Sequence, residues 1–215
     1  MDQGGGVMLC IQDSIQYVEL GFNPYIHILE NGNTRTSNIE ILGAKIFIDN
    51  KWLNIVVIYS PDQNVPEKEF NHYFQQIPKP NLIFGDFNSR HEQWEPEMDR
   101  DSRNKSGKEL FKTLIASDNI SLLSPPGLHT RFDPKTGEGS VLDLFLGDST
   151  VFSNAVMGLG PQLPSDHQPV IAKFNNITYK EFIGKLPRRR IAETQWSLFE
   201  NQLAKLRHTG THFFT

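Results

Sequence analysis

Residues 81–88, Asn-Leu-Ile-Phe-Gly-Asp-Phe-Asn, show how this chain folds and where its chemistry lies. The apolar run 81–84 predicts a short strand that delivers Asp86 and Asn88 into the loop beyond it. Because these two residues stand two positions apart, their side chains point to the same side if the strand direction persists. A carboxylate that handles a proton and a carboxamide that orients a nucleophile suit phosphodiester hydrolysis. The alternative is an ordinary Asx turn after a strand.

A second carboxylate stands inside a run that should be apolar. Asp143 interrupts residues 141–146, and a buried charge is costly unless it is paired. We expect its partner to be His167, in the segment Ser165-Asp166-His167, because a carboxylate on one ring nitrogen supports an imidazolium that faces a phosphate. The alternative is that Asp143 lies on the solvent-exposed face of an edge strand and that His167 is an ordinary loop residue.

Three further side chains are candidates for contacts with a nucleic-acid backbone. Tyr59 ends a predicted strand, where its hydroxyl could bond a phosphate oxygen or simply cap the core. Thr130 and Arg131 could contact a DNA backbone or be ordinary hairpin residues. Cleavage of a phosphodiester also needs a hard cation, and carboxylates with carboxamides suit Mg²⁺, which takes one or two protein carboxylates and keeps several waters.

The pattern of apolar residues predicts a mixed sheet and an α+β fold. Strands joined by short turns favour hairpins, whereas other strands are separated by helical patterns. One helix is expected after Pro66, and a second is expected from the capping box Ser106 and Glu109 with a buried stripe that includes Ile115. The expected strands are residues 7–11, 39–48, 52–59, 81–84, 120–123, 130–132, 140–146, 155–159 and 170–174.

Composition narrows the class of protein. A chain of 215 residues can bury a real core. The single cysteine, Cys10, excludes an internal disulfide and fits a reducing compartment. The start resembles no signal peptide, and no apolar run reaches the roughly 18 residues of a membrane span. We therefore expect an intracellular protein without a membrane segment.

Charge separates the last part of the chain from the rest. Residues 176–215 carry seven Lys and Arg against three Glu, a charge of +4, so residues 1–175 carry −8 of the total of −4. The run 188–190 is basic, and Trp196, Phe199 and Leu203 follow at helical spacing. We expect residues 1–175 to form one domain and residues 176–215 a basic linker with an amphipathic helix.

The ordered motifs resemble those of the endonuclease/exonuclease/phosphatase superfamily. They are residues 58–61 (IYSP), 85–88 (GDFN), 140–143 (SVLD) and 165–167 (SDH). Residues 85–91 (GDFNSRH) with Trp94, then Asn104 and Gly107, are similar to the apurinic-type endonuclease domain of non-LTR (LINE-like, jockey-type) retrotransposons. The resemblance covers residues 4–175, and the tail is similar to a linker toward a reverse transcriptase.

This resemblance implies a fold and a reaction. The fold would be a four-layer α/β sandwich, with two mixed sheets packed face to face and helices outside. The reaction would be a nick in target DNA that uses Mg²⁺ or Mn²⁺ and leaves a 3′-hydroxyl for reverse transcription. The partners would be DNA and the reverse transcriptase domain, the place of action the nucleus, and the chain a monomer.

The resemblance also implies a role for each candidate residue. Asp86 would handle a proton, Asn88 would orient the nucleophile, and Tyr59 would hold a phosphate oxygen. Asp143 would orient His167, which stabilises developing charge. The remaining roles are phosphate or backbone contact by Ser165, Thr130 and Arg131, and support of the metal by Asp166.

One departure from the family pattern bears on activity. The family places an Asn and a metal-binding Glu before its glycine-rich segment, whereas only three residues precede Gly4 here. From this we expect an N-terminally truncated domain that lacks its first strands, its first helix and its principal metal ligand. The alternatives are a non-catalytic remnant that binds DNA weakly and a phosphatase of the same superfamily.

Overall fold

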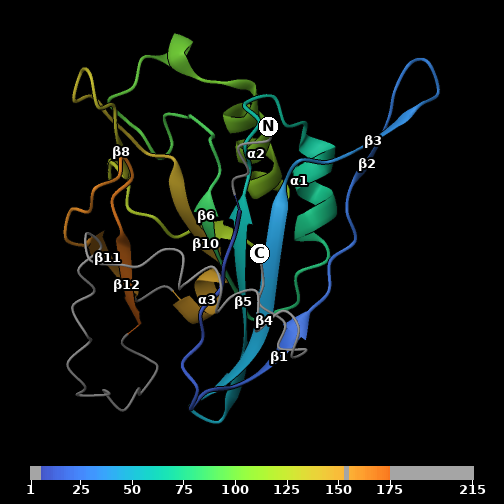
Figure 1. Ribbon diagram of the computed structural model, residues 1–215, viewed down its shortest axis with the longest axis vertical. Coiled ribbons are helices and arrows are strands. Elements are labelled where there is room, and N and C mark those ends of the chain that lie inside the picture. Colours follow the sequence, from blue (N-terminus) through green and yellow to red (C-terminus); the bar gives the residue numbers. More distant parts are fainter. Residues whose placement is uncertain (1–5, 153–154, 175–215) are drawn as a thin grey trace, which may run out of the picture. The chain divides into compact units, whose positions relative to one another are not determined.

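A six-stranded mixed sheet forms the centre of the computed structural model, which describes residues 6–152 and 155–174 (Figure 1). Its strands lie in the order β1-β4-β5-β6-β10-β7. Within this sheet β5 and β6 pair in parallel, and every other pair is antiparallel. The predicted α+β fold with a mixed sheet is therefore confirmed. The bounds are β1 (Gln16–Leu20), β4 (Glu40–Ile48), β5 (Lys51–Tyr59), β6 (Asn81–Asp86), β7 (Ser121–Leu122) and β10 (Asp143–Gly147).

The hairpin of β4 and β5 turns on two residues. Asp49 and Asn50 have φ angles of 52° and 59°, the left-handed region that a two-residue hairpin turn requires. Asp and Asn tolerate this region better than other residues with a side chain. Both strands, expected over residues 39–48 and 52–59, are confirmed, and they pair as a hairpin.

The parallel pairing of β5 with β6 depends on a crossover connection. Helix α1 (Glu67–Phe74) provides it, and it buries Phe70, Tyr73 and Phe74 at the predicted spacing. Pro66 occupies the N-cap position just before the helix. There its fixed φ and its missing N–H do no harm to the helical hydrogen bonds.

Helix α2 (Lys105–Ala116) starts differently from the prediction. Asn104 is the N-cap, and its side-chain oxygen accepts a hydrogen bond of 2.8 Å from the Gly107 N–H. The capping box predicted from Ser106 and Glu109 is therefore wrong. An Asn at the N-cap satisfies the free N–H groups of the first turn as well as a Ser does, so the sequence offered two competing caps.

The side chain of Ser106 ties the helix to a loop instead. Its hydroxyl donates to the Asp62 carbonyl at 2.9 Å and accepts from the Val65 N–H at 2.8 Å. The buried stripe of the helix includes Leu110, whereas Ile115, which was predicted to belong to it, is 70% exposed.

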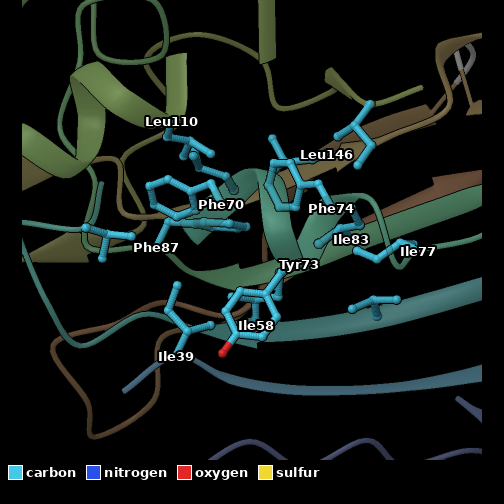
Figure 2. Close-up of a cluster of buried hydrophobic side chains, with 14 of the residues drawn as sticks. Ile39, Ile58, Phe70, Tyr73, Phe74, Ile77, Ile83, Phe87, Leu110 and Leu146 are labelled. Atoms are coloured by element: carbon cyan, nitrogen blue, oxygen red, sulfur yellow. The ribbon is translucent and has the colours of Figure 1, made fainter. Parts of the chain in front are cut away.

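Helices α1 and α2 cover one face of the sheet and enclose the larger core. In Figure 2, Phe70, Phe74 and Leu110 from the helices lie against Ile83 and Leu146 from the strands. These side chains are almost completely buried, and burial of each large apolar side chain contributes about 1.5–3 kcal/mol.

The other face packs on a second set of elements. These are α3 (Ser149–Phe152) and the antiparallel pair β11 (Ala155–Leu159) and β12 (Val170–Phe174). The rings of Phe152 and Phe174 lie 5.1 Å apart within this smaller core. Both strands of the pair were predicted; they form a separate two-stranded sheet, of which Phe174 belongs to the smaller core.

Two predicted strands are wrong in part. Residues 7–11 form no strand and pair with no other segment of the described chain. Residues 140–146 are divided between β9 (Gly139–Ser140) and β10, because β9 pairs with β8 (Arg131–Phe132) whereas β10 pairs with β6. One straight strand cannot serve both partners, so the chain changes direction between Ser140 and Asp143.

Several short elements were not predicted. They include β1 and the hairpin of β2 (Ile26–Ile28) and β3 (Thr34–Thr36), which extends away from the sheet in Figure 1. A 3₁₀ turn at Arg100–Ser102 precedes α2. Three-residue strands and single turns are too short for a periodic pattern to develop.

Some expectations concern other parts of the chain. The predicted linker and amphipathic helix of residues 176–215 lie outside the described residues. In the described ranges, none of the helices combines the length and the apolar character that crossing a bilayer requires.

A glycine in β6 permits the close approach of β5. Gly85 has a φ of 150°, and a Cβ placed on it would lie 1.8 Å from the Ile58 carbonyl oxygen. We expect Gly85→Ala to lower the free energy of unfolding by about 3 kcal/mol or more, measured by urea denaturation. Gly21→Ala is the matched control, since a Cβ there meets nothing within 4 Å. Equal stability of the two variants would contradict the assignment.

Candidate active site

Three side chains predicted to act together form a row across adjacent strands. Tyr59 is the last residue of β5, Asp86 the last of β6, and Asp143 the first of β10. The register pairs Tyr59 with Asp86 and Asp86 with Asp143. Directly paired residues present their side chains on the same face of a sheet. The row therefore crosses three inner strands at one end of the sheet. It lies on the face of the sheet that also carries the smaller core.

His167 joins this row through Asp143. Its ring Nδ1 lies 2.8 Å from Asp143 Oδ2. This hydrogen bond raises the pKa of His167 above its ordinary value, although partial burial acts in the opposite direction. The carboxylate thus favours an imidazolium, with Nδ1 carrying the shared proton and Nε2 available to another group.

Thr130 holds the two segments that carry this pair. Its hydroxyl accepts hydrogen bonds from the N–H groups of Leu142 and Asp143 at 3.2 and 3.0 Å, and its carbonyl accepts one from the Gln168 N–H at 2.7 Å. The residue is completely buried. Its hydroxyl oxygen is thus committed to the backbone, and the contact of Thr130 with a phosphate stays a prediction.

Arg131 and Asp166 form an ion pair beside the site. Arg131 Nε lies 3.0 Å from Asp166 Oδ2, and an isolated β-bridge joins Arg131 to His167. The Asp166 carboxylate thus has a cationic partner in this structure, and its support of a metal stays a prediction. Ser165 lies nearby and accepts a hydrogen bond from the His167 N–H at 3.1 Å; its contact with phosphate stays a prediction.

Asp86 and Asn88 are joined as an Asx turn and also face the same way. Asp86 Oδ1 accepts from the Asn88 N–H at 2.9 Å, and Asp86 Oδ2 accepts from Asn88 Nδ2 at 3.2 Å. Asn88 Nδ2 also donates to the Ser60 carbonyl at 3.0 Å. The backbone φ of Asn88 is 45°, in the left-handed region that Asn tolerates better than most residues with a side chain.

The electrostatics of the row are unfavourable to a second negative charge. Burial, and next the neighbouring Asp143, raise the pKa of Asp86 to about 6, while the hydrogen bond from the Asn88 N–H opposes the rise. Burial, followed by the charges of Asp86 and Glu40, raises the pKa of Tyr59. An Asp with a pKa near neutrality can take up and release protons under physiological conditions.

Sequence reasoning missed Glu40 as a member of the row. It is the first residue of β4 and pairs in register with Tyr59 on the side away from Asp86. The useful signal was its place beside Ile39 at the start of a predicted strand, because the alternation of that strand puts it on the same face as Ala44.

Sequence reasoning also missed how Asn104 supports Asn88. Asn104 Oδ1 accepts from the Arg90 N–H at 3.0 Å as well as from Gly107, and its Nδ2 donates to the Asn88 carbonyl at 2.6 Å. A Cβ on Gly107 would lie 2.0 Å from the Arg90 carbonyl oxygen. The first turn of α2 therefore packs closely against the loop that follows Asp86.

Few side chains of the described residues are placed to bind a metal ion. Within the described ranges, no three His, Cys, Asp or Glu side chains come together in a way that could hold a metal ion. Asp86 lacks a cationic partner, whereas Asp143 is paired with His167 and Asp166 with Arg131.

Comparison with known proteins places this geometry in context. The family model described as "Endonuclease-reverse transcriptase" matches residues 53–171, more than half of the chain. No curated protein matches the sequence. The endonuclease domain of TRAS1, a telomere-specific non-LTR retrotransposon, is similar in structure, with a TM-score of 0.53 at 13% identity over 75% of this chain and 80% of that one.

Two other solved structures are less similar, both at a TM-score of 0.40. One is beta toxin from Staphylococcus aureus, with 18% identity over 64% of this chain and 58% of that one. The other is the inositol polyphosphate 5-phosphatase domain of spsynaptojanin, with 14% identity over 91% of this chain and 64% of that one.

The support of the Asp86–Arg90 loop by Asn104 can be measured without any assay of function. We expect Asn104→Ala to lower the free energy of unfolding by about 1–2 kcal/mol, as other lost N-caps do. Amide hydrogen exchange should accelerate at Arg90 and Gly107, whose N–H groups both donate to Asn104.

Asp99→Ala is the control, because Asp99 caps only the short 3₁₀ turn and its side chain accepts one hydrogen bond, from the Asp101 N–H. Unchanged protection of Arg90 in Asn104→Ala would show that this side chain does not hold the loop.

Proposed function

This chain belongs to the endonuclease–reverse transcriptase family, and on that premise we propose that it hydrolyses a phosphodiester bond in target DNA. The observation that carries the proposal is the row of Tyr59, Asp86 and Asp143 at one sheet edge, extended by the hydrogen bond of 2.8 Å between Asp143 and His167. A proton acceptor, an imidazolium and phosphate-binding groups then converge on a single place.

Each side chain has a task that follows from its surroundings. Asp86, with its raised pKa of about 6, accepts the proton of the attacking water. Asn88, fixed through its Nδ2, presents its carboxamide oxygen to the same water. His167, kept protonated by Asp143, stabilises the negative charge that develops on the phosphate. Tyr59 donates its hydroxyl to a phosphate oxygen.

A divalent cation fits the donor set. Mg²⁺ binds through one or two protein carboxylates together with substrate phosphates and water, and Asp86 and Asn88 offer a carboxylate and a carboxamide oxygen. The pKa of Asp86 is raised partly by the charge of Asp143, and a cation would relieve this repulsion. When bound, the metal would neutralise charge on the non-bridging phosphate oxygens.

The products and the setting follow from the same proposal. Water attacks the phosphorus and the P–O3′ bond breaks, so the departing O3′ takes up a proton and the phosphate stays on the 5′ side. The resulting 3′-hydroxyl can be extended by a reverse transcriptase of the same element. The substrate is the target DNA, and the site of action is the nucleus.

Relaxation of supercoiled plasmid in the presence of Mg²⁺ tests the proposal. We expect the intact chain to nick the plasmid, EDTA to abolish nicking, and Asp86→Asn or His167→Gln to reduce the rate about 10²–10⁴-fold, the usual contribution of a general acid or base. The matched controls are Asp118→Asn on the exposed surface and His72→Gln at a half-buried histidine of α1, and both should nick at the normal rate.

Nicking that persists in Asp86→Asn and His167→Gln would refute the assignment of the site. A protein that binds the plasmid without nicking it would instead have the non-catalytic role.

The ionised carboxylate of Asp86 is expected to lower the stability of the folded protein while it supports activity. The folded state raises the pKa of this carboxyl from 3.8 to about 6, so folding is penalised once the pH exceeds the ordinary value and the penalty is complete above pH 6. In EDTA at neutral pH we expect Asp86→Asn to raise the free energy of unfolding by about 2–3 kcal/mol.

Below about pH 4 both forms of Asp86 are protonated, and the two proteins should unfold alike. Urea denaturation across this pH range measures the difference. An Asp86→Asn variant that is less stable than the wild type at neutral pH would contradict the proposed destabilisation by the Asp86 carboxylate.

A further inference from the structure

A polar pocket of about 400 Å³ opens beside the proposed reaction centre. Asn88 belongs to both, and the other lining residues that matter here are Gln63, Arg90, Arg131 and Ser140. Pockets that hold a small ligand usually enclose about 300–1,000 Å³. The volume is therefore large enough for a group the size of one nucleotide.

The lining of this pocket is cationic. It contains two arginines and no Asp or Glu, while the carboxylates that pair with these arginines, Glu95 and Asp166, do not belong to the lining. A second pocket, at the base of the β2–β3 hairpin, contrasts with it, because Asp62 and Glu69 line that pocket together with Arg35. Of these two pockets in the described part of the chain, the charge of the lining therefore favours an anionic ligand for the one beside Asn88.

A carboxylate binds one side of each guanidinium group, and the remaining N–H donors can bind a ligand. Arg90 uses Nη2 and Nε on the oxygens of the buried Glu95, at 2.7 and 3.4 Å. Arg131 uses Nε on Asp166 at 3.0 Å. In the described part of the chain, Nη1 of Arg90 and both Nη atoms of Arg131 have no hydrogen-bond partner. A guanidinium held in this way meets a phosphate with little loss of side-chain entropy.

Two neutral side chains add further donors. Gln63 and Ser140 line the same pocket, and within the described residues their side chains make no hydrogen bond to the protein. Donors of this kind, interleaved with arginines, are typical of contacts with the sugar–phosphate backbone rather than with base edges.

We infer that this pocket binds the nucleotide next to the scissile phosphate, with Arg90 and Arg131 on its backbone phosphate. The inference rests on the proposed function, because it takes Asn88 to lie at the reacting phosphate. It adds a substrate subsite that determines how the DNA strand is positioned for attack, and it makes Arg131 a binding residue through its free Nη atoms.

Salt-dependent binding of a labelled DNA duplex to the full chain in EDTA tests the subsite. The logarithm of the binding constant falls linearly with the logarithm of salt concentration, and each lost phosphate contact reduces the slope by about 1. We expect this reduction in Arg131→Met and in the pair Arg90→Met with Glu95→Gln, which leaves no unpaired buried carboxylate. Arg35→Met removes the same charge at the other pocket and should keep the wild-type slope.

Duplexes with a single methylphosphonate, which removes the charge of one phosphate, locate the contact. We expect one position at which the neutral phosphate weakens binding by the wild type severalfold and leaves binding by Arg131→Met unaffected. Additive losses at every position, or equal slopes for Arg131→Met and Arg35→Met, would overturn the inference. So would a free deoxynucleoside monophosphate that competes for Arg131 as effectively as the duplex does.

Plasmid nicking measured in parallel separates the two proposals. Nicking by the wild type together with unchanged salt slopes in the arginine variants refutes the subsite and leaves the hydrolytic function standing. Binding that depends on Arg131 without any nicking supports the pocket as a DNA phosphate site and refutes hydrolysis.

Discussion

The parallel pairing of β5 with β6 is the constraint on which the candidate site depends. It places the last residues of both strands at the same end of the sheet. The antiparallel β10 pairs with β6 there, and Asp143 is its first residue. The pairing is close because Gly85 leaves the Ile58 carbonyl room that a side chain would fill. A shift of one residue in this register would turn Asp86 to the opposite face.

The first turn of α2 fixes the loops that leave these two strands. Ser106 holds the loop after β5 through Asp62 and Val65, and Asn104 holds the loop after β6 through Asn88 and Arg90. A single helix end thus positions both sides of the site. The helix is anchored in the larger core, so the precision of the site depends on packing that lies some distance from it.

The sequence predicted those parts of the site that local pattern reveals. Asp143 stood out because a charge interrupted an apolar run, and the same reasoning suggested His167 as its partner. The roles of Thr130 and Asn104 could not be read in this way. The burial of Thr130 depends on segments that are distant in sequence, and the Ser106–Glu109 spacing was a stronger local signal for a cap than Asn104.

The fold was predictable to a similar extent and for similar reasons. Long strands such as β4 and β5 have a clear pattern, whereas the division of residues 140–146 between β9 and β10 follows from the choice of partners. The ion pair of Asp166 with Arg131 likewise joins segments that are distant in sequence, so local pattern could not reveal it.

The chemistry of the nicked ends tests the central claim most directly. Plasmid incubated with the intact chain and Mg²⁺ is given to a DNA polymerase and labelled nucleotides without prior phosphatase treatment. Hydrolysis at the Tyr59–Asp86–Asp143–His167 site predicts immediate extension from a 3′-hydroxyl and a 5′-phosphate on the other side of the nick. Ends that require removal of a 3′-phosphate before extension would contradict the account.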